Sequence, residues 1–155
     1  MNETLDRLFS ELALDDAPGH ERLRLEFGYA CVCRVEHLLE EAAVRDCLRG
    51  LGQFIQGVMP SAKFAELAAT ATRLAHQHPG SKSIDGCGHA SVSATYAVAN
   101  ALAGKARQAA EYAAYAAVYG QGGYGAVADR SSFEPEYSWQ ADCLRSLASR
   151  RVVAS

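Results

Sequence analysis

The sequence predicts an all-α fold: a compact antiparallel bundle of six to seven helices in a single domain, residues 1–155. Apolar residues recur at the three-and-four spacing of amphipathic helices, and no segment of useful length alternates as a strand does. An alanine-rich stretch, residues 87–119, opens with a helix-length run that has no charged side chain. Because a helix with no polar face must be buried on nearly every side, we place an alanine-rich helical hairpin at the centre of the bundle.

Composition and charge narrow the function classes. A chain of 155 residues should bury roughly two-thirds of the surface that it exposes when unfolded, so it needs no metal or disulfide to fold. The net charge of −3 and the lack of a basic run argue against a nucleic-acid partner. The acidic first residues and the odd number of cysteines, 5, indicate a cytoplasmic protein with reduced thiols. Residues 84–103 are weakly charged, but Asp85, His89 and Asn100 interrupt them, so we expect no membrane span.

Two helices are expected in the first part of the chain. The first has an apolar face of Leu5, Leu8, Phe9 and Leu12. Residues 15–19 break it, so residues 1–17 are expected to form a peripheral helix and a linker. A second helix begins near His20 or Glu21. Its buried stripe is Phe27, Cys31, Val35 and Leu38.

The third and fourth helices precede the alanine-rich stretch. The third has the apolar face Val44, Cys47, Leu48, Leu51, Phe54, Ile55 and Val58. Gly50 and Gly52 lie inside it, so we expect another backbone to approach closely there. The fourth opens after Pro60 and ends at residues 79–80. Its apolar face is Phe64, Leu67, Ala68, Ala71 and Leu74.

The alanine-rich stretch carries two polar or aromatic stripes of equal spacing. Adding nineteen to the residue numbers of the first stripe gives those of the second, which indicates an internal repeat. The alternative is that the match arises by chance, because alanines often align with one another in so alanine-rich a segment. The stripes are His89, Ser93, Tyr96 and Asn100, and Gln108, Tyr112, Tyr115 and Tyr119. If the chain turns at Gly104, the stripes face one another across a seam, whereas an unbroken helix would rotate them apart by roughly 100°. Residues 103–105 resemble a helix end followed by a restart, which favours the turn.

The last part of the chain holds a second candidate surface. Residues 120–125 are glycine-rich and are expected to form an irregular loop, and a final helix opens at residues 133–136 and frays over residues 150–155. Loops of this kind often bind partners. The candidate partner-binding residues are Tyr124, Asp129, Arg130, Phe133, Glu134, Glu136 and Tyr137.

Local motifs for chemistry are weak. Cys31 and Cys33, like Cys87 and His89, are two residues apart and lack a second pair with zinc spacing, so we expect no metal and no other cofactor. Ser91 lies close to His89, but no strained elbow surrounds a nucleophile, and we expect no catalytic residue. An active site assembled from separate helices would leave no local signature, so an enzyme stays an alternative.

Three segments together resemble a known family. They are His89-Ala-Ser-Val-Ser-Ala-Thr-Tyr-Ala-Val-Ala-Asn, Gln108-Ala-Ala-Glu-Tyr-Ala-Ala-Tyr-Ala-Ala, and Tyr137-Ser-Trp-Gln140. Over roughly residues 64–150 the chain resembles the Imm-5 group of immunity proteins from bacterial polymorphic toxin systems, which are alanine-rich and all-helical. The resemblance implies a protein that binds and blocks a cognate toxin in the same cytoplasm by occlusion.

The leading expectation is therefore a non-enzymatic cytoplasmic binding protein, an immunity protein whose partner is a toxin. One alternative is a small-molecule-binding protein or enzyme that uses the seam between the alanine-rich helices. The seam residues are His89, Ser93, Tyr96, Asn100, Tyr112, Tyr115 and Tyr119. Another alternative is a structural subunit that forms a homo-oligomer through a broad apolar face.

Overall fold

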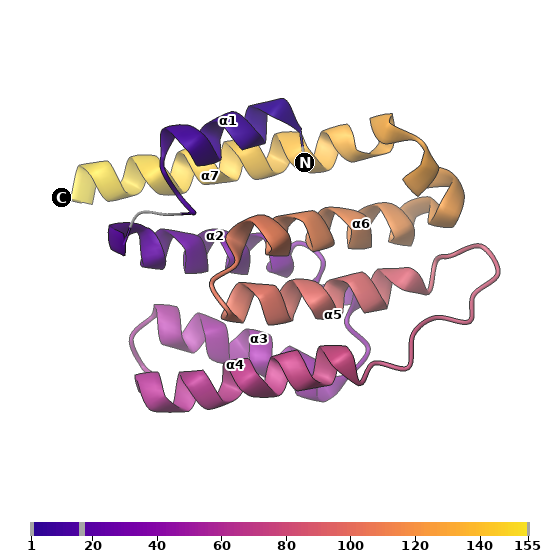
Figure 1. Ribbon diagram of the computed structural model, residues 1–155, viewed down its shortest axis with the longest axis horizontal. Helices are drawn as coiled ribbons and strands as arrows, with labels where there is room; N and C mark the ends of the chain where they lie inside the picture. The colour runs from indigo at the N-terminus through magenta and orange to yellow at the C-terminus, as the bar shows by residue number, and fades with distance from the viewer. Residues whose placement is uncertain (1, 16–17, 155) are drawn as a thin grey trace.

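Seven α-helices make up most of the protein, and the all-α prediction is confirmed (Figure 1). The computed structural model describes residues 2–15 and 18–154, with side chains through residue 150, and these residues contain no strand. The helices are α1 (Glu3–Glu11), α2 (Glu21–Cys33), α3 (Ala42–Ile55), α4 (Ser61–His76), α5 (His89–Leu102), α6 (Ala106–Ala128) and α7 (Glu134–Ala154). Short 3₁₀ turns, η1 (Pro18–His20), η2 (Glu36–Leu38) and η3 (Arg130–Phe133), connect some of them. None of the helices within these ranges has the length and apolar character needed to cross a membrane.

The helices α5 and α6 form the central antiparallel hairpin that the alanine-rich stretch predicts. The chain turns at Gly104, whose φ of +75° lies in the left-handed region that favours glycine. Helix α5 contacts α2, α3, α4 and α6, so it is packed from several sides. Most of its alanines are buried, as the charge-free sequence requires.

Close packing of α2 against the hairpin explains why its helices are built from small residues. A Cβ atom on Gly28 of α2 would lie 3.3 Å from the Cβ of Ala101 and 3.8 Å from the Cβ of Ala109. Helix α2 thus approaches both arms of the hairpin at one point, and it lies behind them in Figure 1. Larger side chains at these positions would push the helix axes apart.

Two expectations about α2 and α3 are wrong in detail. Helix α2 ends at Cys33, and the chain continues through η2, although Val35 remains buried because its N–H bonds to the carbonyl of Val32. Side chains, not another backbone, fill the space above the glycines of α3: Leu67 covers Gly50 and the hydroxyl of Tyr29 covers Gly52.

The apolar face predicted for the third helix includes Val58, which lies beyond the end of α3. Helix α3 ends at Ile55, and Val58 in the following turn is 69% exposed. Gly57 takes a φ of +82°, which reverses the chain and carries Val58 away from the face that its spacing predicts.

Helices α1 and α7 pack together along one side of the bundle (Figure 1). Leu5 and Phe9 of α1 are buried, and the ring of Phe9 meets that of Phe27 edge-on at 5.8 Å. Residues 16 and 17 of the expected linker lie outside the described residues. The sequence predicts a frayed tail over residues 150–155, but helix α7 continues to Ala154. Ser155 lies outside the described residues.

Candidate functional site

The two stripes of the hairpin face one another, in reverse order. In both stripes, successive residues are four, three and four positions apart. This spacing is the same in either chain direction, so the residues of two antiparallel helices can still pair. His89 and Tyr119 lie equally far from Gly104 along the chain, and their ring centroids are 5.3 Å apart. Tyr96 and Tyr112 are also equally far from Gly104, and their rings stack at 5.4 Å. The nineteen-residue echo thus places aromatic rings opposite one another, although His89 faces Tyr119 and not Gln108.

The hairpin carries exposed tyrosines whose rings lie near one another. Tyr112 is 38% exposed, Tyr115 is 41% exposed and Tyr124 is 50% exposed. Ring contacts at 6.2 Å join Tyr115 to Tyr119 and Tyr119 to Tyr124. We call this surface the tyrosine ridge; its members are His89, Tyr96, Tyr112, Tyr115, Tyr119 and Tyr124.

His89 and Asn100 of the first stripe have hydrogen-bond partners within the protein. The side-chain amide of Asn100 donates to the carbonyl of Tyr96 at 2.8 Å, and Nε2 of His89 lies 2.7 Å from the hydroxyl of Tyr124. Ser93 is buried. A pocket of about 200 Å³ is lined by Tyr96 and Asn100, but it opens between α4 and α5, away from the rings of α6.

The glycine-rich segment is helical with a kink, and the expectation of an irregular loop is wrong. Helix α6 continues on both sides of Gly122 and Gly123, where the backbone leaves helical geometry. Gly123 has φ +63° and ψ −147°, a conformation that essentially only glycine adopts. The kink carries Tyr124 against the loop before α5, where its N–H donates to the carbonyl of Asp85 at 2.7 Å.

This contact leaves no room for side chains on the glycines that meet there. A Cβ on Gly123 would clash with the carbonyl oxygen of Asp85, and a Cβ on Gly86 would lie 2.7 Å from the ring of Tyr124. The bend in α6 and the loop before α5 accordingly lie side by side at one end of the molecule (Figure 1). Together they hold Tyr124 in contact with His89.

The predicted partner-binding residues divide into exposed and structural members. Tyr124, Asp129, Arg130 and Glu134 are exposed, and the carboxylate of Asp129 caps η3 by accepting from the N–H of Ser131 at 3.0 Å. Glu136 is 5% exposed and accepts from Nε of Arg34 at 2.7 Å. We therefore assign Glu136 to the fold and not to a contact surface.

Phe133 and Tyr137 are each 8% exposed but line a pocket of about 410 Å³ beside Tyr115. The ring of Phe133 meets that of Tyr115 edge-on at 5.0 Å and stacks with that of Tyr137 at 5.9 Å. Sequence spacing does not predict this pocket, because the three rings come from separate elements.

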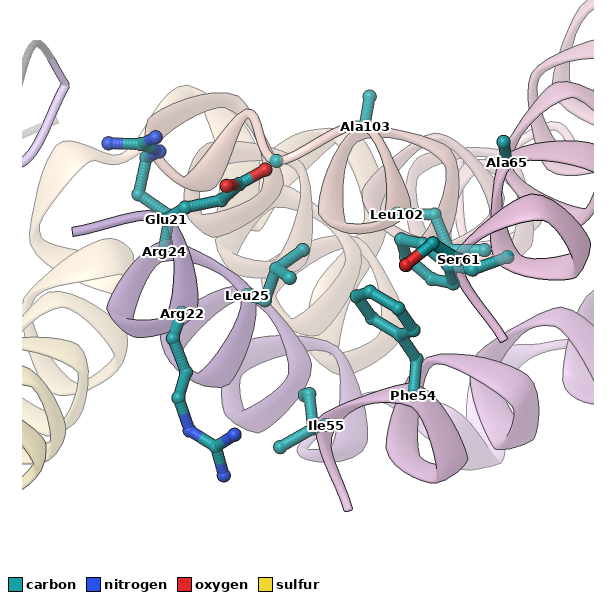
Figure 2. A pocket seen from close by; sticks show the side chains of 12 residues that line it. Glu21, Arg22, Arg24, Leu25, Phe54, Ile55, Ser61, Ala65, Leu102 and Ala103 are labelled. Carbon is teal, nitrogen blue, oxygen red and sulfur yellow. The ribbon is translucent and has the colours of Figure 1, made fainter. Parts of the chain in front are cut away.

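A second pocket that the sequence did not predict opens where α2, α4 and the α5–α6 turn meet, with a volume of about 540 Å³ (Figure 2). The side chains of Leu25 and Phe54 face one another across it, and the hydroxyl of Ser61 points toward the same space, while the guanidinium of Arg22 points away. The ring of Phe54 stacks on that of Phe64 at 4.0 Å. The pocket has an apolar floor and a polar rim.

The cysteines have the properties of structural thiols. Burial raises the pKa of Cys31, Cys33, Cys47 and Cys143, and a hydrogen bond to Asp85 raises the pKa of Cys87. A raised pKa keeps a thiol protonated and unreactive at neutral pH. The described residues contain no cluster of three or more His, Cys, Asp or Glu side chains that could hold a metal ion.

Comparison with protein-family models, with curated proteins and with solved structures returns no match.

Proposed function

We propose that this protein is a cytoplasmic, non-enzymatic binding protein whose tyrosine ridge docks onto a cognate protein, in the manner of an immunity protein that neutralises a toxin by direct binding. The observation that carries the proposal is the set of exposed tyrosines on one face of a rigid hairpin. Tyr112, Tyr115 and Tyr124 are each at least 38% exposed, whereas Phe9, Phe27 and Phe133 are at most 8% exposed.

Tyrosine suits a docking surface for two physical reasons. Its ring contributes large apolar area and its hydroxyl contributes a hydrogen bond, so tyrosine is enriched at protein interfaces and among the residues that dominate binding energy. The ridge is also held in place before any partner arrives, because neighbouring rings touch and His89 bonds to Tyr124. A surface that is already ordered loses little side-chain entropy on binding.

The class of function follows from the resemblance to the Imm-5 group and from the state of the cysteines. All 5 are free, as expected in a reducing compartment. Their raised pKa values make them poor nucleophiles, which favours occlusion of a target over chemistry on it.

Affinity purification from the native host tests the proposal. The wild-type protein is compared with a Tyr112→Ala/Tyr115→Ala variant. Both side chains are partly exposed but also pack on neighbouring rings, so the folding of the variant is measured together with its binding. The matched control is Val58→Ala, which removes another exposed apolar side chain from the α3–α4 turn. We expect wild type and control to recover the same protein and the double variant to lose it. Equal recovery by all three, with circular dichroism showing equal folding, contradicts the proposal.

The pocket in Figure 2 favours a second candidate, the binding of a small molecule. Its volume of about 540 Å³ is in the range of ligand sites, which are commonly about 300–1,000 Å³ with an apolar lining and a few polar groups. It lies outside the seam, so this candidate differs from the site predicted from sequence. A fragment titration followed by NMR should shift the ring signals of Phe54 and Phe64 if the pocket binds ligands, and no shift for any fragment contradicts it.

A further inference from the structure

The pocket beside Tyr115 has walls made of aromatic rings. Tyr115 of α6 meets Phe133 of η3 edge-on, with an interplanar angle of 70°, and Phe133 stacks on Tyr137 of α7 at 18°. The pocket of about 410 Å³ is thus bounded by rings in two orientations. A ring carries negative charge density on its face, so a site with several ring walls attracts a cation.

The lining of the pocket carries one charge of each sign, and further carboxylates lie near the hydroxyl of Tyr137. Burial is the largest cause that raises the pKa of Tyr137 to about 12, and the negative charges of Glu111, Asp6 and Glu134 contribute to the same shift. Glu134 itself lines the pocket and is exposed at the start of α7. Arg130 also lines the pocket and would compete with an incoming cation.

We propose that this pocket receives the guanidinium group of an arginine side chain on the partner protein, stacked against the aromatic lining on the side of the exposed Tyr115 ring and paired with the carboxylate of Glu134. This inference rests on the proposed function and specifies the partner's chemistry at one end of the tyrosine ridge. A guanidinium fits both features of the site, because it is planar enough to stack on rings and presents donors that match a carboxylate.

Other side chains fit less well. An acidic side chain would be attracted by Arg130, but it would then lie beside the carboxylate of Glu134, and like charges repel at this range. An aliphatic side chain would fill the space between the rings but leave that carboxylate to lose water without a partner. A lysine ammonium would pair with Glu134, but it is a compact, strongly hydrated charge that cannot stack as a plane.

The inference is tested without the partner, by NMR titration of the labelled protein with N-acetyl-arginine amide. The comparison ligand is N-acetyl-citrulline amide, which has nearly the same shape and no charge. We expect arginine to shift the ring signals of Tyr115, Phe133 and Tyr137 with an affinity about 3- to 10-fold higher than that of citrulline, the ratio that a partly desolvated cation–π contact provides. Equal affinity for the two ligands would overturn the inference.

Variants that remove one charge from the pocket test whether arginine affinity changes in the expected direction. Glu134→Gln should weaken arginine binding about 3-fold or more, and Arg130→Gln should strengthen it by removing the competing cation. Glu21→Gln, an exposed carboxylate beside the other pocket, is the matched control and should change nothing. Unchanged binding in Glu134→Gln, or weaker binding in Arg130→Gln, overturns the inference.

Failure of this inference can be distinguished from failure of the proposed function. If arginine does not bind, while the Tyr112→Ala/Tyr115→Ala variant still loses the partner, the ridge is a docking surface and only the arginine assignment is wrong. If arginine binds with the expected preference but the double variant retains the partner, the proposed function is wrong and the pocket recognises a cationic group in another setting.

Discussion

Replacing Gly123 with alanine should disrupt the contact between the kink of α6 and the loop before α5. The substitution has two effects at one position. It places a side chain on a backbone with φ +63° and ψ −147°, and its Cβ would occupy the position of the Asp85 carbonyl oxygen. The hydrogen bond from the N–H of Tyr124 to that oxygen must then lengthen or break.

The expected cost follows from these effects. A non-glycine residue in this region costs about 1–3 kcal/mol. Loss of a backbone hydrogen bond adds about 0.5–1.5 kcal/mol. Alanine also lowers the conformational entropy of the unfolded chain, which stabilises the folded state by about 0.4–1 kcal/mol. The variant should therefore lower the free energy of unfolding by about 2–3 kcal/mol, a substantial part of the roughly 5–15 kcal/mol typical of a domain.

Urea denaturation followed by circular dichroism measures the change, and hydrogen exchange at the amide of Tyr124 locates it. The matched control is Gly125→Ala, two residues further on, where the backbone is helical and a Cβ would meet nothing within 4 Å. This control should be neutral or stabilise the protein by up to about 1 kcal/mol. If Gly123→Ala is no less stable than Gly125→Ala, the contact between kink and loop does not hold Tyr124 as described.

Three further substitutions test other parts of the structure. Gly104→Ala should lower the free energy of unfolding by about 1 kcal/mol, since the turn needs a positive φ; a stability gain in urea denaturation would contradict the turn. Glu136→Gln should cost about 2 kcal/mol, less than the removal of one member of a fully buried ion pair because the Arg34 side chain is 36% exposed. Arg34 stacks on Trp139 at 4.7 Å, so tryptophan fluorescence should also change, and an unchanged spectrum would count against the pair. The raised pKa of Tyr137, about 12 against 10.0 for the unfolded group, means that the folded state holds its proton more tightly. Stability should be unaffected below pH 10 and fall by about 3 kcal/mol as the pH rises toward 12, and Tyr137→Phe should lack this loss; equal pH profiles for both proteins would refute the assignment.

The alanine-rich stretch shows how far a single sequence can predict structure here. The lack of charge required burial on nearly every side, and this placed α5 at the centre without knowledge of its partners. The turn at Gly104 is predicted from local sequence alone, because glycine readily takes the left-handed conformation that ends a helix. The turn then predicts that the two stripes face one another, and ring contacts join His89 to Tyr119 and Tyr96 to Tyr112.

The errors lie where tertiary contacts override local composition. The glycines of residues 120–125 were read as flexible, but two of them permit a kink within a helix, fixed by a distant carbonyl at Asp85. Glu136 is a predicted surface residue because it follows the glycine-rich segment together with other charged and aromatic residues, yet Arg34, which lies just after α2, donates a hydrogen bond to it. The pocket beside Tyr115 is formed by three elements and has no periodic signature. Each of these features depends on contacts between residues far apart in the sequence, which periodicity does not encode.

The central claim is that the tyrosine ridge binds a partner protein. The most direct measurement is the dissociation constant of the recovered partner for the wild type, for Tyr112→Ala/Tyr115→Ala and for the Val58→Ala control. Tyrosines at the centre of an interface commonly contribute about 2 kcal/mol each, so the double variant should bind about 100-fold or more weakly, and the control should bind as the wild type does. A dissociation constant for the double variant within about twofold of the wild-type value, well under 1 kcal/mol, would show that the partner docks elsewhere on the molecule.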